Sequence, residues 1–146
     1  MERSDFGRDT GRNPLPDFGA AERDLTPATT ADSLMRRGRV RAFLGRFDEA
    51  EADFAESLRL SAGNVWAWTW RGNARVAAGD APAAEAHFTK AIAVNQEFAE
   101  AWEGRGHVRL GRRAFAGATK DYEEAIRLNP SLGPILGTKL QEAKGR

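Results

Sequence analysis

Arginine recurs at a regular spacing in this chain. Two rows of arginines recur with a period of 34, and their members are Arg37, Arg71, Arg105, Arg41, Arg75 and Arg109. Guanidinium groups donate to carboxylates and phosphates, so these rows could form internal ion pairs or bind an anionic ligand. Sixteen residues after the first row come Asp53, His87 and Asp121. Because a partly buried arginine needs a partner, we predict two ion pairs, Arg37–Asp53 and Arg105–Asp121, which His87 interrupts in the middle.

The second row of arginines, at 41, 75 and 109, has two interpretations. We expect the aliphatic stems to cover neighbouring helices while the guanidinium groups remain in water. A ladder of three solvated arginines could instead bind acidic groups or phosphate, which is the weaker hypothesis. The 22 Lys and Arg residues nearly balance the 21 Asp and Glu residues. This balance argues against a dedicated nucleic-acid-binding protein.

Catalytic and metal-binding patterns are scarce in the sequence. The chain has no cysteine, which excludes a disulfide scaffold, a thiolate zinc site and a cysteine nucleophile. Its only histidines, His87 and His107, have neither a metal-site spacing nor a catalytic-triad arrangement. The sequence Gly104-Arg105-Gly106 lies in a segment with helical character, so it predicts no phosphate-binding loop. We therefore expect no enzyme activity, no cofactor and no metal site.

The elements that position these residues repeat with the same period of 34. The repeated columns include Leu34, Trp68 and Trp102; Gly38, Gly72 and Gly106; Ala50, Ala84 and Ala118; and Phe54, Phe88 and Tyr122. The period divides the chain into residues 1–30, three units at 31–64, 65–98 and 99–132, and a C-terminal segment. Each unit has two predicted helices. In the middle unit Gly79-Asp80 ends the first helix, and Asp80 is placed to cap the second.

This pattern resembles the tetratricopeptide repeat, a family that has the same period. The matching residues are Trp68 or Trp102, Gly72 or Gly106, Ala84 or Ala118, Phe88 or Tyr122, Ala91 or Ala125, and Pro130. The resemblance covers residues 31–130. It implies an all-α solenoid in which each repeat is an antiparallel helix pair, and the pairs stack into a right-handed superhelix with a concave groove.

The last segment, residues 131–146, is predicted to be a capping helix. Repeat arrays need a terminal element with a polar outer face, because each repeat otherwise leaves one apolar face in water. Ile135, Leu136 and Leu140 are expected to form the apolar stripe of this helix. Lys139 and Glu142 are among the residues that would keep its other side hydrated.

The resemblance also implies which residues line the groove. In the family, the second, fifth, ninth and twelfth positions of each first helix face the groove. Carried onto this chain, these are Asp32, Met35, Arg39, Ala42, Trp66, Thr69, Asn73, Val76, Glu100, Glu103, His107 and Leu110, with Trp70 beside that face. One subtype of the family grips a partner's terminal carboxylate through lysines and asparagines. Asn73 matches that subtype, but Met35, Thr69 and Glu103 stand where lysines are wanted, which argues against such a clamp.

Two tryptophans are the strongest local sign of a binding surface. Trp66 and Trp70 lie four residues apart and so form a side-by-side pair on one helix. Exposed aromatic residues of this kind anchor protein partners. The alternative is that one or both pack against the chain's own N-terminal segment or the preceding repeat. With aromatic anchors and mixed polar residues, the groove suits an extended or helical peptide.

Residues 1–30 are rich in Gly, Pro, Asp, Arg and Thr and show no period, so we expect no structure from them alone. Either they are an unstructured leader or they form an arm that docks on a partner or on the chain's own groove. The apolar residues available to such an arm are Phe6, Leu15, Phe18 and Leu25. Thr26-Pro27 and Thr30 mark the expected start of the first helix.

The leading functional hypothesis is an adaptor or scaffold that binds a protein segment in its groove. The alternative is a structural subunit of a larger assembly, anchored by the N-terminal arm, and nucleic-acid or anion binding is a weaker third hypothesis. The sequence has no signal peptide or membrane-spanning segment, from which we expect a cytoplasmic protein that does not insert into membranes. Arginine outnumbers lysine 18 to 4, which favours a GC-rich bacterial source.

Overall fold

The computed structural model describes residues 20, 23 and 27–145, and all regular secondary structure within them is helical. The helices are α2 (Ala31–Phe43), α3 (Phe47–Leu60), α4 (Val65–Ala77), α5 (Ala81–Val94), α6 (Ala99–Gly111), α7 (Phe115–Leu128), the short 3-10 helix η2 (Pro130–Leu132) and α8 (Gly133–Lys144). Residues 31, 65, 99 and 133 each begin a helix. The period of 34 therefore extends into the last helix, and the expected all-α repeat fold is confirmed.

Local sequence signals determine where the helices start and stop. The Thr30 hydroxyl accepts a hydrogen bond from the Ser33 N–H at 3.0 Å and completes a capping box at the start of α2. Asp80 caps α5 as predicted, because its carboxylate accepts a hydrogen bond from the Ala83 N–H at 3.2 Å. The turns after α2 and α4 contain Gly45 and Gly79 with φ of 80° and 82°. The equivalent position in the third repeat is Arg113, with φ of 64°.

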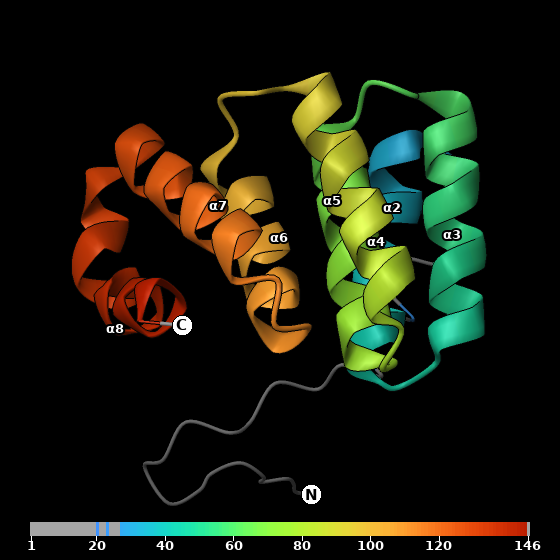
Figure 1. Ribbon diagram of the computed structural model, residues 1–146. Helices are drawn as coiled ribbons and strands as arrows, with labels where there is room; N and C mark the ends of the chain where they lie inside the picture. The colour runs from blue at the N-terminus through green and yellow to red at the C-terminus, as the bar shows by residue number, and fades with distance from the viewer. Residues whose placement is uncertain (1–19, 21–22, 24–26, 146) are drawn as a thin grey trace, which may run out of the picture.

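The helices pack as three consecutive pairs, α2 with α3, α4 with α5, and α6 with α7 (Figure 1). Successive pairs meet through α3 and α4 and through α5 and α6. The first helices of the pairs also contact one another, α2 with α4 and α4 with α6. The first helices therefore form a continuous surface, which holds the candidate site.

One large aromatic residue fills the centre of each repeat. Phe54, Phe88 and Tyr122 are all fully buried. Phe88 lies between two glycines, since a Cβ added to Gly72 or to Gly104 would come within 2.8 Å or 2.5 Å of its ring. Glycine thus brings the helices close enough for a small set of large side chains to fill the core.

The terminal helix α8 packs against α7. Leu136 and Ala143 are buried and Leu140 is partly buried, whereas Ile135 is 67 % exposed. The expectation that Ile135 belongs to the apolar stripe is therefore wrong. Leu136 continues the repeat column that contains Trp102. The repeat register turns that residue toward the core and its neighbour Ile135 toward solvent.

We find no helix in the described part of the chain that is long and apolar enough to cross a membrane.

Candidate functional site

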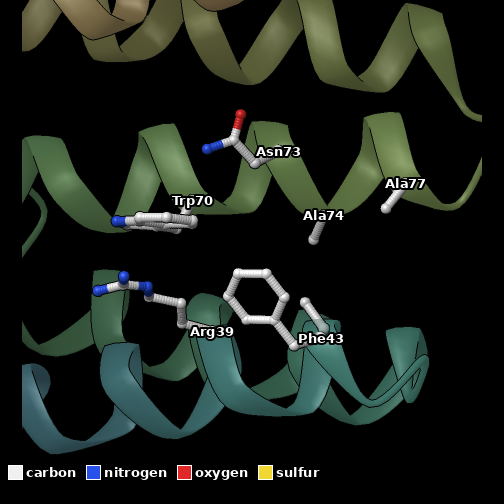
Figure 2. Close-up of a pocket in the computed structure, with 7 residues that line it drawn as sticks. Arg39, Phe43, Trp70, Asn73, Ala74 and Ala77 are labelled. Atoms are coloured by element: carbon white, nitrogen blue, oxygen red, sulfur yellow. The ribbon is translucent and has the colours of Figure 1, made fainter. Parts of the chain in front are cut away.

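A small apolar depression, which we call the α2–α4 notch, lies between the first helices of the first two repeats. It has a volume of 80 Å³ and is lined by Arg39, Ala42, Phe43, Trp70, Asn73, Ala74 and Ala77. Figure 2 shows the Arg39 side chain beside the Trp70 ring, and the guanidinium carbon lies 4.0 Å from the ring centroid. The Phe43 ring centroid lies 6.4 Å from that of Trp70, and 60 % of Phe43 is exposed. The notch therefore offers two aromatic rings and one cation.

A second depression, the α4–α6 pocket, has a volume of 260 Å³. Its lining residues are Trp66, Thr69, Trp70 and Asn73 of α4 and Glu100, Glu103, Gly104 and His107 of α6. Trp66 packs edge-on against Phe98, with ring centroids 4.6 Å apart, and remains 45 % exposed. Trp70 and Asn73 line both depressions, so the two are contiguous. In Figure 2 the Asn73 amide extends away from Arg39 and Phe43.

The far wall of the α4–α6 pocket is held in place by hydrogen bonds and packing. His107 Nδ1 lies 2.8 Å from the Tyr122 hydroxyl oxygen, and His107 Nε2 lies 3.5 Å from a Glu103 carboxylate oxygen. Burial raises the pKa of Tyr122 to about 12, so its hydroxyl keeps its proton at neutral pH. The core residue Tyr122 thereby fixes the orientation of the His107 ring at the edge of the pocket.

Most of the residues expected in the groove come together at these two depressions. They are Arg39, Trp66, Thr69, Trp70, Asn73, Glu103 and His107. Asp32 lies outside both and forms an exposed ion pair with Arg36 at 2.9 Å.

Met35 and Thr69, the fifth residues of the first two repeats, are less accessible to solvent than the family pattern implies. Met35 is only 8 % exposed and belongs to a buried core cluster with residues of α3 and α4, so its assignment to the groove surface is wrong. Thr69 is 3 % exposed, and its hydroxyl donates to the Val65 carbonyl oxygen at 2.8 Å. The cluster around Met35 contains Ala67 and Ala74 of the next repeat as well as Phe54 of its own, so Met35 lies within the packing between the two repeats.

Sequence reasoning missed four lining residues of these depressions, which are Phe43, Ala74 and Ala77 in the notch and Gly104 in the pocket. Phe43 is the last residue of α2, directly before the turn at Leu44 and Gly45, and a large apolar residue next to the turn glycine was the available sequence signal. Gly104 occupies the position in the third repeat that Trp70 occupies in the second. Gly104 therefore lines the α4–α6 pocket without adding a side chain to it, and its close approach to the Phe88 ring excludes a Cβ at this position.

The structure brings together both arginine–aspartate pairs that the sixteen-residue spacing predicts. Arg37 donates to Asp53 from Nε at 2.9 Å and from Nη2 at 2.8 Å. Arg105 donates to Asp121 in the same two-pronged way, at 3.0 Å and 2.9 Å. Because the aspartates are only 3 % and 1 % exposed, these pairs tie the helices of a repeat together from inside.

The second arginine row does not keep its guanidinium groups in water. Arg41 lies 3.1 Å from Asp53, Arg75 Nε lies 3.5 Å from Glu51, and Arg109 Nε lies 2.8 Å from Glu85. The three side chains are only 17 %, 18 % and 25 % exposed. The expectation of a solvated ladder is therefore wrong, because each arginine faces a carboxylate. This geometry leaves the row poorly placed to hold phosphate.

In the middle repeat, which has no aspartate at this position, the arginine pairs with a carboxylate of the preceding repeat. Arg71 Nε donates to Glu51 of α3 at 2.7 Å. His87 instead lies beside Trp68, with ring centroids 5.8 Å apart. Burial is the main reason that the pKa of His87 is lowered, and the nearby Arg71 lowers it further. Glu51 and Glu85 lie 34 residues apart at equivalent positions of two repeats, and this recurrence was the sequence signal for such contacts between repeats.

Two remaining expectations concern metals and the N-terminal arm. Within the described residues, His, Asp and Glu side chains form no group of three that could hold a metal ion. The arm residues Phe6, Leu15, Phe18 and Leu25 lie outside the described residues.

Comparisons with known proteins agree with this architecture. Two family models, both described as tetratricopeptide repeat, match residues 31–64 and 71–132. No curated protein sequence matches the chain. Solved structures do match, and 165 chains are similar.

Three of these structures illustrate the likeness. One is the first tetratricopeptide domain of Spaghetti (RPAP3) bound to the HSP90 peptide SRMEEVD, with TM-score 0.74, 24 % identity, and 79 % of this chain and 90 % of that chain covered. The human RPAP3 first domain gives TM-score 0.73 at 24 % identity, with the same coverage of both chains. The Arabidopsis OM64 domain gives 0.71 at 19 % identity, with 77 % of this chain and 94 % of that chain covered. At these identities the structures show a shared fold, and the two family models together with this fold establish that the chain belongs to the tetratricopeptide-repeat family.

Proposed function

We propose that this protein is an adaptor that binds a segment of a partner protein along the surface formed by α2, α4 and α6. The observation that carries the proposal is the pair of contiguous depressions that share Trp70 and Asn73. Phe43 and Trp66 stand at their edges with 60 % and 45 % of their surfaces exposed. Large aromatic residues beside small pockets are the usual anchors of protein interfaces.

The partner segment differs in chemistry from the acidic peptide bound by the RPAP3 domain. That domain binds SRMEEVD. Here Glu100 and Glu103 line the larger depression, and Met35 is buried. A segment with closely spaced acidic residues would meet like charge on the α6 side, so the proposed partner carries apolar anchors and few acidic residues at that end.

The test is a selection of random peptides displayed on phage against the full chain, followed by calorimetric titration of a selected peptide. Phe43→Ser and Trp66→Ala should each weaken binding by roughly tenfold or more, because each removes an aromatic anchor. Ile135→Ser is the matched control, since Ile135 is 67 % exposed but lies on α8, outside both depressions. Circular dichroism would establish that each variant is folded. Selected peptides that bind the three variants and the parent equally would contradict the proposal.

A further inference from the structure

The charges around the two depressions are unevenly distributed. Among the described residues, Arg39 of α2 is the only charged one that lines the α2–α4 notch. The α4–α6 pocket is lined by Glu100 and Glu103, with His107 beside them. The surface is therefore cationic on its α2 side and anionic on its α6 side, so a bound segment meets opposite charges at its two ends.

The walls of the α4–α6 pocket suit a cation in particular. Trp66 and Trp70 come from α4, and the two glutamates come from α6. Aromatic faces attract cations through the quadrupole of the ring, and carboxylates add hydrogen-bond acceptors. The Trp66 ring and the two glutamates therefore favour a cation, whereas the Trp70 ring already has the Arg39 guanidinium 4.0 Å from its centroid and supplies apolar surface.

Gly104 lines the α4–α6 pocket and contributes no side chain to it. Any side chain at that position would project from α6 where the closely packed Phe88 ring leaves no room, since a Cβ there would lie 2.5 Å from it. The pocket has a volume of 260 Å³, and the close packing of α6 on Phe88 requires glycine in this part of its wall. A flexible aliphatic stem with a charged head can enter from the open side.

We propose that the α4–α6 pocket receives a basic side chain, an arginine or a lysine, of the partner segment. The proposal rests on the proposed function and adds the chemistry of one subsite to it. The aliphatic stem lies along Trp66 and Trp70, and the charged head faces Glu100 and Glu103. Arginine fits best, because a planar guanidinium both stacks on indole and donates in parallel to a carboxylate.

The same charges fix the direction of the segment. Arg39 lies 4.0 Å over the Trp70 ring in the notch, so a second cation there would be repelled. An apolar or acidic side chain fits the notch, and the basic side chain fits the pocket one helix further on. The partner is thereby distinguished from an acidic peptide and from a uniformly basic one.

The direct test titrates N-acetyl-arginine methylamide into the full chain and follows the four indole N–H signals by NMR. The Trp68 and Trp102 indoles donate to the carbonyl oxygens of Ala62 and Gln96, at 3.2 Å and 2.9 Å, so they serve as internal controls. We expect the Trp66 and Trp70 signals to shift and the control signals to stay. The neutral analogue with citrulline in place of arginine should bind roughly fivefold more weakly. Equal responses to the two probes would overturn the proposal.

A charge-matched pair of variants separates local contacts from net charge. The double variant Glu100→Gln with Glu103→Gln should remove the preference for the arginine probe over the citrulline probe. The control double variant, Glu49→Gln with Glu56→Gln, changes two acidic residues on the surface of α3 and should retain the preference for the arginine probe. Ionic strength raised to about 0.5 M should reduce the preference in the parent chain. A preference that survives in the pocket variant would overturn the proposal.

The phage selection distinguishes this inference from the proposed function. Peptides selected by the parent chain should be enriched in a basic residue next to an apolar one, and those selected by the pocket variant should lack the basic residue. Selected peptides without a basic preference would overturn the subsite while the adaptor function stands. If no peptide is selected but the arginine probe is still preferred, the adaptor function fails and the cation pocket stands.

Discussion

Glu51 of α3 accepts a hydrogen bond from Arg71 of α4 and so joins the first repeat to the second. The equivalent arginines, Arg37 and Arg105, pair with aspartates of their own repeats. The difference arises at His87, which occupies the position of those aspartates and offers Arg71 no carboxylate. The middle repeat thus exchanges an internal pair for a contact with its neighbour.

Replacing Glu51 by glutamine should lower the free energy of unfolding by about 1–3 kcal/mol, because two poorly exposed arginines would lose their carboxylate. Arg71 and Arg75 are 19 % and 18 % exposed. Urea unfolding followed by circular dichroism measures the change. Glu56→Gln is the control, because Glu56 forms only a surface pair with Arg59, and it should leave stability unchanged. Equal effects of the two substitutions would show that the contact between repeats adds nothing.

Gly72→Ala should destabilise the protein even though alanine favours helices by about 1 kcal/mol. The new Cβ would lie 2.8 Å from the Phe88 ring, and Gly104 on the other side of that ring leaves it no room to move. We expect a net loss of about 1–3 kcal/mol in thermal or urea unfolding.

Gly137→Ala provides the matched control for this close approach. Gly137 lies in α8, and a Cβ there would have no neighbour within 4 Å. This substitution should stabilise the protein by up to about 1 kcal/mol. A gain in stability for both variants would contradict the role assigned to Gly72.

Arg113→Gly should raise the free energy of unfolding by about 0.5–1 kcal/mol. The substitution relieves the strain of a left-handed backbone conformation, and part of this gain is offset because glycine has more conformational entropy in the unfolded chain. Arg113 has φ of 64°, where the first two repeats have Gly45 and Gly79. Arg113→Ala is the control, since it removes the contact of the guanidinium with Phe115 but keeps the strained backbone. If the alanine variant is stabilised as much as the glycine variant, the backbone is not the cause.

The stability of the protein should fall in mildly acidic solution, in part because of His87. Burial lowers the pKa of His87 from its ordinary value of 6.5, so the unfolded chain binds a proton more readily than the folded one. Its contribution is complete above pH 6.5 and is lost as the pH falls toward the lowered pKa. His87→Gln should therefore reduce the difference between urea midpoints measured at about pH 7 and about pH 5. An unchanged difference would exclude His87 as a source of the pH dependence.

The period of 34 was enough to predict the fold, because Gly38, Phe54 and their equivalents specify a close helix pair wherever they recur. It also placed Trp66 and Asn73 on the candidate surface. It could not reveal that Met35 is covered, since burial there depends on the neighbouring repeat. The contact between Arg71 and Glu51 was not predicted for the same reason, because the sixteen-residue spacing relates only residues of the same repeat.

The middle repeat carries both halves of the junction between the first two repeats. Its outgoing side has Glu85 and Phe88, which match Glu51 and Phe54, and its incoming side has Arg71. A tandem duplicate of residues 65–98 would therefore meet its own copy with a junction chemistry that the molecule already uses. Residues 65–98 are therefore a repeating unit whose two ends are complementary to each other. The column of Glu51 and Glu85 continues with Thr119, and the buried Ala143 of α8 occupies the position where the second arginine row would continue, so the junction of α7 with α8 lacks this ion pair.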